Sequence, residues 1–372
     1  MERISEHFET VVIGAGQAGL SVGYHLASAD RPFVILDTNE RVGDSWRKRW
    51  DSLRIFTPAG ASGLPGWPIP APAWSFPTKD ELANYFESYA ARFKLPVRNG
   101  MTVTRVSSQD GRFVVTCGER RLEADNVVIA SGHEYTPRIP DFATELDAKV
   151  VQLHSSEYRR PSQLQNGDVL VVGAGNSGAD IALEVARTHR TWLSGRFKRA
   201  PVGPSRHRLL TAAMLPIISH VLTVDTPIGR KLRPKMSRIS PPVERVTAKA
   251  LAAAGVVHVP RTVGVRSGSP ALADGSSLDV ANVIWCTGYR PQLAWIDMPI
   301  FEQDGEPIQE RGIVPGVPGL YFVGRRFQYA FTSALLVGVG RDAAYVVKQI
   351  VGRTSARNPA RSANAGHVAR SA

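Results

Sequence analysis

Two stretches of this chain decide its fold. Residues 10–19 read TVVIGAGQAG, and residues 168–178 read DVLVVGAGNSG. Each stretch has an apolar run typical of a buried strand, then three glycines in the spacing GxGxxG, and each is followed by a segment typical of a helix. In this context the first glycine permits a tight turn, the second lets the backbone approach a pyrophosphate, and the third lets helix and strand pack closely. The repeat therefore predicts two separate dinucleotide sites.

The residue after the second strand of the first unit indicates which nucleotide binds there. The apolar run Phe33–Leu36 is followed by Asp37, 18 positions beyond Gly19. A carboxylate at this place accepts hydrogen bonds from ribose hydroxyls and repels a 2′-phosphate. The first site is therefore expected to suit FAD or NAD.

The second unit has a cation at the same offset. The run 191–193 is followed by Ser194, Gly195 and Arg196, and Arg196 lies 18 positions beyond Gly178. Because a guanidinium binds phosphate with two parallel hydrogen bonds, this site favours NADPH. The alternative is that Arg196 is an ordinary solvated surface charge.

The charge balance is basic. The chain has 45 Lys and Arg against 33 Asp and Glu, a formal net charge of +12, which suits nucleic acid, a membrane surface or an anionic ligand. Part of the excess lies in residues 353–372, which have no acidic residue and no apolar periodicity, so we expect a disordered, solvated tail. No recognition motif accompanies these cations, so no nucleic-acid partner is expected.

Several other classes of protein and site are excluded. The two cysteines, Cys117 and Cys286, are too few and too far apart for a disulfide framework, a Cys-rich zinc site or a CxxC redox pair. The sequence shows no cluster of metal-ligand residues. It starts without a secretory signal, and its most apolar stretch, 209–224, is too short and too interrupted to span a membrane. We therefore expect a cytoplasmic protein.

The order of the remaining elements predicts an α/β fold of two Rossmann-like dinucleotide-binding domains, one inserted into the other. Residues 126–132 and 282–288 repeat one shape, a buried strand that ends in small residues, while a strand and a helix near the C-terminus complete the first unit. The expected domains are 1–155 with 289–352 for FAD, and 156–288 for NADPH with a helical insertion at about 205–250. The basic, apolar-rich part of that insertion is either a lid on the protein or a contact with a membrane surface.

Beyond the fingerprints, four stretches resemble the class B flavin-containing monooxygenases, a family that includes plant indole-3-pyruvate monooxygenases and Baeyer–Villiger monooxygenases. These are Arg41–Trp46, Gly63–Pro68, His154–Tyr158 and Cys286–Pro291. The resemblance implies that NADPH reduces FAD and that the reduced flavin forms a C4a-(hydro)peroxyflavin with O₂. It also implies oxygen transfer to small sulfides, amines or carbonyl compounds, with the protein supplying binding and orientation.

The resemblance also assigns roles to individual residues. The residues implied to hold FAD are Gly14, Gly16, Gln17, Ala18, Gly19 and Asp37, with Ser45 and Trp46 lining the flavin. Those implied to hold NADPH are Gly173, Gly175, Asn176, Ser177 and Gly178, with Ser194 and Arg196 on the 2′-phosphate. The implied catalytic residues are Thr57, Trp46 and His154, where His154 either steers the nicotinamide or packs at a hinge.

Two departures from the family pattern keep other functions open. Thr57-Pro58 stands where the family usually has Ser-Asn, and Arg325 stands where disulfide reductases have an Asp. One alternative is an NAD(P)H-dependent flavin reductase or oxidase that delivers electrons to O₂ or a quinone. A more remote one is a flavin-bearing regulator that binds nucleic acid. The expected partners are a small-molecule substrate and O₂, and the oligomeric state is left open.

Overall fold

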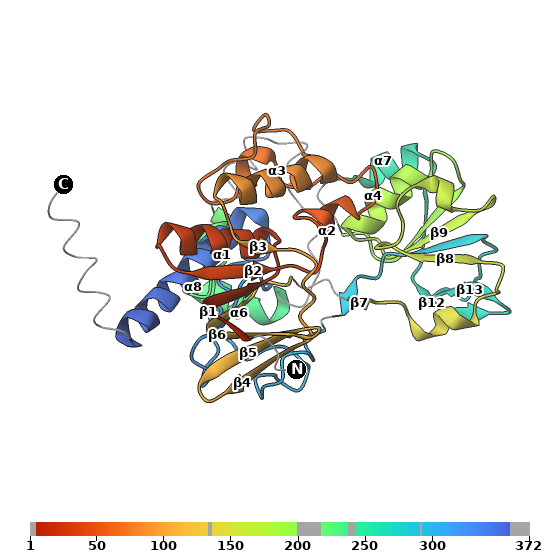
Figure 1. Ribbon diagram of the computed structural model, residues 1–372. Coiled ribbons are helices and arrows are strands. Elements are labelled where there is room, and N and C mark those ends of the chain that lie inside the picture. Colours follow the sequence, from red (N-terminus) through yellow and green to blue (C-terminus); the bar gives the residue numbers. More distant parts are fainter. Residues whose placement is uncertain are drawn as a thin grey trace.

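The computed structural model describes residues 5–132, 136–198, 217–236, 243, 245–290 and 292–357. They form two lobes, each built on a sheet with a parallel core (Figure 1). The α/β prediction of two Rossmann-like units is confirmed.

The first lobe has a seven-stranded sheet. Its spatial order is β3 (Val97–Arg98), β2 (Phe33–Leu36), β1 (Ser5–Ile13), β6 (Arg120–Ile129), β5 (Arg112–Cys117) and β4 (Arg105–Gln109), with β16 (Leu320–Phe322) beside β6. The first half of β6 pairs antiparallel with β5 and its second half pairs parallel with β16, so one long strand joins the hairpin to the Rossmann-like core.

Both faces of this sheet are buried. Val12 of β1 packs toward α1 (Gln17–Ser28), α3 (Lys79–Arg92) and α8 (Leu336–Arg357), while Val11 and Ile13 pack into the core on the opposite face. The short helix α2 (Asp44–Arg47) lies beside α3. An apolar strand buried on both faces is the expected form of a central parallel strand.

The second lobe has a five-stranded parallel sheet. Its order is β11 (Val257–Val259), β10 (Thr191–Ser194), β9 (Val169–Val172), β14 (Asn282–Trp285) and β8 (Val151–His154). Helices α4 (Asn176–Val185) and α7 (Ala248–Ala253) cover one face. The antiparallel ribbon β12 (Thr262–Arg266) and β13 (Ser269–Leu272) lies on the other. Single 3₁₀ turns occupy Ala59–Ala61, Asp141–Glu145 and Pro161–Gln163.

The chain crosses between the lobes at a two-stranded hinge. Strand β7 (Thr136–Pro137) pairs antiparallel with β15 (Tyr289–Arg290), and the Arg138 N–H donates to the Gly288 carbonyl at 2.9 Å. Because β8 pairs with β14, the first crossing lies near Pro137 rather than at the predicted boundary of residue 155.

Two further boundaries differ from the prediction. Residues 217–236, which include α6 (Pro227–Met236), lie against the first lobe rather than the second, because Thr223 forms a β-bridge with Ala330 (Figure 1). We call residues 217–236 the strap. Helix α8 continues to Arg357, and Arg353 anchors it by donating to the Asp125 carbonyl at 2.8 Å, so the ordered chain extends beyond residue 352. Residues 358–372 of the predicted tail lie outside the described residues.

Candidate functional site: two nucleotide cradles and the hinge between them

The first glycine loop follows β1 and has room for a ligand at one glycine only. Gly14 has φ +105°, and a Cβ there would lie 2.6 Å from the Ala130 carbonyl oxygen. A Cβ on Gly19 would lie 1.8 Å from the Gly14 oxygen. A Cβ on Gly16, which caps the N-terminus of α1, would meet nothing within 4 Å. Gly14 and Gly19 therefore serve the turn, and Gly16 keeps the helix N-terminus open, as a bound pyrophosphate requires.

The second glycine loop repeats this geometry. Gly173 has φ +108°, and its Cβ would lie 2.3 Å from the Cys286 carbonyl oxygen. A Cβ on Gly178 would lie 1.8 Å from the Gly173 oxygen, whereas Gly175, the N-cap of α4, again faces open space. The following residues Asn176 and Ser177 form the first turn of α4. Both loops thus fit a dinucleotide pyrophosphate.

Asp37 is fixed beside the first cradle. Its buried carboxylate accepts the Ala15 N–H through Oδ2 at 2.6 Å and the Asn39 N–H through Oδ1 at 2.8 Å. The Asn39 side-chain amide also donates to Oδ1 at 2.9 Å. A carboxylate offers about four lone-pair sites, so this one can still accept from a ribose. Sequence reasoning missed Asn39, which orients the carboxylate.

The C-terminal part of the chain completes the first cradle. The Gln17 side-chain amide donates to the Ala334 carbonyl at 2.8 Å, just before α8 begins. Gly324, after β16, lies so close to Ala18 that a Cβ would be 3.0 Å from the Ala18 Cβ. Arg325 is buried and pairs with Glu306. The first cradle therefore combines the two ends of the sequence.

The strand registers show how the second cradle differs from the first. Ile13 is level with Leu36, and Val172 is level with Ser194. The structural equivalent of Asp37 is therefore Gly195, and Arg196 lies one residue further along, where it is exposed. Asp37 and Arg196 each lie 18 positions after the last glycine of their loop, but they do not occupy equivalent positions in the two lobes.

Ser194 points into the protein. Its buried hydroxyl lies 3.0 Å from the Pro260 carbonyl and 2.7 Å from the Thr262 hydroxyl, and it accepts the Thr262 N–H at 2.8 Å. The expected contact of this hydroxyl with a 2′-phosphate therefore has no geometric support. The place left free of a side chain is Gly195, whose carbonyl lies 2.7 Å from His258 Nε2.

The residues expected to line the flavin come from α2 and the loop after it. Gly43, with φ +90°, allows α2 to approach α3, since a Cβ there would lie 2.5 Å from the Ala83 carbonyl oxygen. Ser45 is exposed, and its carbonyl accepts from Arg49 at 3.2 Å. Trp46 packs against the hydrophobic cores of both lobes. This indole therefore lies where the two lobes meet.

Thr57 forms a hydrogen bond with Ser62, in the turn that follows Thr57. The Ser62 hydroxyl donates to the Pro58 carbonyl at 2.8 Å, and Thr57 Oγ1 lies 2.7 Å from Ser62 Oγ. Because the Ser62 proton is used on Pro58, Thr57 is the donor in this pair. Its hydroxyl could donate to a flavin-bound oxygen only if this hydrogen bond broke.

His154 is part of the hinge. The ring is fully buried, with Nε2 3.0 Å from the Gly288 carbonyl and Nδ1 2.8 Å from the Ser156 hydroxyl. It meets Tyr289 edge to face at 5.0 Å between centroids, and the Tyr289 hydroxyl accepts from Arg49 at 2.8 Å. Since a carbonyl only accepts, Nε2 donates to Gly288. The contacts thus link His154 to Arg49, three residues after Trp46.

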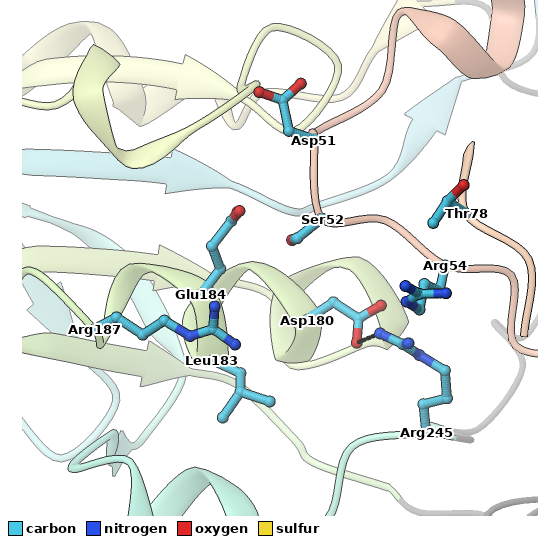
Figure 2. A pocket seen from close by; sticks show the side chains of 9 residues that line it. All are labelled: Asp51, Ser52, Arg54, Thr78, Asp180, Leu183, Glu184, Arg187 and Arg245. Atoms are coloured by element: carbon cyan, nitrogen blue, oxygen red, sulfur yellow. Dashed lines mark hydrogen bonds and ion pairs between the residues drawn. The ribbon is translucent and has the colours of Figure 1, made fainter. Parts of the chain in front are cut away.

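A charged cavity of about 310 Å³ lies between the lobes (Figure 2). It is lined by Asp51, Ser52, Arg54, Thr78, Asp180, Leu183, Glu184, Arg187 and Arg245. Asp180 pairs with Arg245 at 3.1 Å, and burial raises the pKa of its carboxyl although Arg245 opposes the shift. The walls of the cavity come from both lobes, so a change in the relative position of the lobes would change the shape of the cavity.

The cysteines do not form a redox pair in this structure. Cys117 and Cys286 are both free, and they belong to the cores of different lobes. Burial raises the pKa of Cys117 to about 11 and also raises that of Cys286. A high pKa disfavours the reactive thiolate. Within the described ranges, no three His, Cys, Asp or Glu residues are grouped as metal ligands, and no helix is long and apolar enough to cross a membrane.

Comparison with known sequences places these features in a family. A model of the pyridine nucleotide-disulphide oxidoreductases matches residues 11–198. An uncharacterized CzcO-like oxidoreductase of Geobacillus kaustophilus is 39% identical over 92% of this chain and 98% of its own length. The indole-3-pyruvate monooxygenase YUCCA1 of Oryza sativa is 28% identical over 91% of this chain and 90% of its own length.

Solved structures agree. A flavin-containing monooxygenase from Stenotrophomonas maltophilia superposes with a TM-score of 0.74 and 30% identity, covering 94% of this chain and 99% of that one. OTEMO in complex with FAD and NADP shares the fold, with a TM-score of 0.67 and 17% identity over 95% of this chain and 87% of its own. The chain therefore belongs to the pyridine nucleotide-disulphide oxidoreductase family and, within it, to the class B flavin monooxygenase-like enzymes that use a flavin and a pyridine nucleotide. The resemblance inferred from the motifs is confirmed.

Proposed function

We propose that this enzyme is an FAD-dependent monooxygenase that oxidises NADPH and transfers oxygen from O₂ to small sulfides, amines or carbonyl compounds. The observation that carries the proposal is the difference between two otherwise matching cradles. One ends in the buried carboxylate of Asp37, and the other has Gly195 at that place, followed by Arg196. A carboxylate favours a free ribose, while a small residue followed by a cation leaves room for a 2′-phosphate.

In this proposal the first lobe holds FAD and the second holds NADPH. Gly16, with Gln17 and Ala18 behind it, presents the N-terminus of α1 to one pyrophosphate, and Gly175 presents that of α4 to the other. The bound flavin supplies the redox chemistry. The chain binds and orients the two nucleotides, and Trp46 lies where the lobes meet.

The activities of two related proteins support the oxygenase. The Stenotrophomonas maltophilia enzyme is a flavin-containing monooxygenase, and the rice protein is an indole-3-pyruvate monooxygenase. One feature favours the reductase or oxidase alternative: Thr57 donates its proton to Ser62, and Pro58 has no side-chain amide to donate instead. An enzyme without such a donor would release more of its reduced oxygen as H₂O₂.

The test follows the oxygen atoms. The FAD-loaded protein is supplied with NADPH and ¹⁸O₂, and a panel of thioethers, amines and ketones is analysed by mass spectrometry while H₂O₂ is measured in parallel. The proposal expects one ¹⁸O atom in a product and less H₂O₂ than NADPH consumed. If H₂O₂ accounts for all the NADPH consumed with every compound, or if added quinone is reduced and no product carries ¹⁸O, the enzyme is an oxidase or reductase instead.

A further inference from the structure

The strap shows hydrophobic side chains to solvent. The described residues include seven large hydrophobic side chains that are markedly exposed. Three of the seven lie in one twelve-residue segment of the strap, residues 217–228. Ile217 is 55% exposed, Val221 is 39% exposed and Ile228 is 55% exposed. Single exposed apolar residues need no explanation, but a local concentration marks an interaction surface.

These side chains cannot simply turn inward, because the strap backbone is fixed to the first lobe. The Val224 N–H donates to the Tyr329 carbonyl at 2.8 Å, and the Phe331 N–H donates to the Leu222 carbonyl at 3.0 Å. Arg341 donates to the Ser219 carbonyl at 2.8 Å. The buried strap residues Ser219, Thr223 and Gly229 form the packed side.

The three hydrophobic residues lie close together along the strap. Ile217 and Val221 are four residues apart in one helical turn, so they share a face. The Thr226 hydroxyl donates to the Val221 carbonyl at 2.5 Å, which holds this turn against the start of α6. Ile228 is in the first turn of α6. We call Ile217, Val221 and Ile228 with the cations of α6 the strap patch.

The cations of α6 give the patch its charge. The helix contains Arg230, Lys231, Arg233 and Lys235 and no acidic residue. Lys231 and Lys235 are exposed, on the same side of the helix as Ile228, and neither forms an ion pair with a described residue. Asp225, just before α6, is the one acid of the strap.

We propose that the strap patch binds the surface of an anionic lipid bilayer. The strap lies against the first lobe and presents apolar side chains next to several cations. This combination is typical of a peripheral membrane contact. The phosphate headgroups complement the charge of the four α6 cations. The side chains of Ile217, Val221 and Ile228 enter the boundary between the headgroups and the acyl chains. A second copy of this chain is a poorer occupant, since symmetric pairing of the patch would bring like charges together. The contact is peripheral, because no helix of the described ranges is suited to span a membrane. The proposal does not depend on the oxygenase activity.

The experiment is co-sedimentation of the full, FAD-loaded chain with vesicles. One set contains phosphatidylcholine alone and the other contains phosphatidylcholine with phosphatidylglycerol. We expect binding to the anionic set that weakens as salt is raised. Two double variants test the patch: Ile217→Ser with Ile228→Ser, and Lys231→Glu with Lys235→Glu. Both change exposed side chains, and each should weaken binding at least ten-fold.

Matched controls change the same chemistry elsewhere. Val263→Ser with Ile308→Ser replaces two other exposed hydrophobic residues, which are 54% and 44% exposed. Lys149→Glu with Lys249→Glu makes the same change in net charge at exposed positions outside the strap. We expect both controls to bind within about two-fold of the wild type, since effects of charge away from the contact are screened. Thermal unfolding of all four variants checks that the fold is kept.

Three results would overturn the proposal. The first is no retention by anionic vesicles at low salt. The second is binding that the two strap variants retain, which would place the contact elsewhere, for example in the basic C-terminal residues. The third is a strap variant that converts a dimer to a monomer in sedimentation velocity while vesicle binding is unchanged, which would make the patch a contact between copies of the chain.

Discussion

At the scale of single residues, the three glycines of each fingerprint have different tasks. Gly178 has no room for a Cβ, since the Gly173 oxygen would be 1.8 Å away, whereas Gly175 has nothing within 4 Å. The same holds for Gly19 and Gly16 in the first loop. One glycine thus serves the fold and another serves the ligand, although both belong to one motif.

This difference predicts opposite phenotypes for two similar variants. Gly178→Ala should lower the free energy of unfolding by about 3 kcal/mol, the upper end of the usual cost of overpacking, because backbone atoms cannot move aside. Gly175→Ala should cost about 1 kcal/mol or less, the usual range for a change at an N-cap. Urea unfolding of both proteins measures this. Equal destabilisation of the two variants would show that the loop geometry described here is wrong.

In the proposed function, preference for NADPH over NADH depends on Arg196. Arg196→Ala should raise the KM for NADPH ten-fold or more, the loss of roughly 1.5–3 kcal/mol expected for a charge-assisted contact. The KM for NADH should change little, because NADH lacks the 2′-phosphate. Steady-state kinetics give the KM for NADPH and for NADH in the wild type and in Arg196→Ala. Lys149→Ala is the control for the loss of a surface charge. A similar increase in both KM values would refute the assignment.

At the scale of elements, the strap and α8 enclose an unusual group of charges. Asp342 is 3% exposed, and burial raises the pKa of its carboxyl to about 6, although Ser333, Arg341 and Arg311 oppose the shift. Arg311 and Arg341 both stack on Tyr329, at 4.3 and 4.4 Å from the ring centroid. A buried acid whose pKa is raised stabilises the fold only while it is protonated.

The pH dependence of stability follows from this shift. Between its ordinary pKa of 3.8 and the raised value of about 6, the native protein binds a proton that the unfolded chain has released. Stability from this group is therefore present at low pH and is lost as pH rises through 6. Asp342→Asn should raise the free energy of unfolding by roughly 2 kcal/mol at pH 8, with a smaller gain at lower pH. Urea unfolding at several pH values checks this, and a loss of stability at pH 8 would mean that the attraction of the Asp342 carboxylate to the charges of Arg311 and Arg341 outweighs its desolvation.

At the scale of the whole molecule, the parts predictable from sequence are those set by local spacing. The GxGxxG spacing and the helix that follows it are local features of the sequence, and the structure has a strand, a glycine turn and a helix at both places. The hinge boundary was misplaced because β8 joins the second sheet through β14, some 130 residues later. The contact between Arg49 and Tyr289 spans 240 residues, and no pattern in the sequence signals it.

The strap shows the same limit. Its composition indicated a basic and apolar insertion, but its position on the first lobe depends on main-chain hydrogen bonds with residues 329–331, which any side chains there could make. The offset of Arg196 is a subtler case, since equal spacing in sequence hid a one-residue difference in register. Local spacing therefore predicts the cradles, and long-range pairing decides how they are arranged.

The most direct test of the account is the anaerobic reduction of bound FAD by NADPH, followed by stopped-flow absorbance in the wild type, Gly16→Ala and Gly175→Ala. If the chain holds two separate nucleotide sites, Gly16→Ala loses most of its FAD. Gly175→Ala keeps its FAD but needs at least ten-fold more NADPH to reach half of its maximal reduction rate. The account is contradicted if Gly16→Ala retains FAD as the wild type does, or if Gly175→Ala is reduced at wild-type rates at every NADPH concentration.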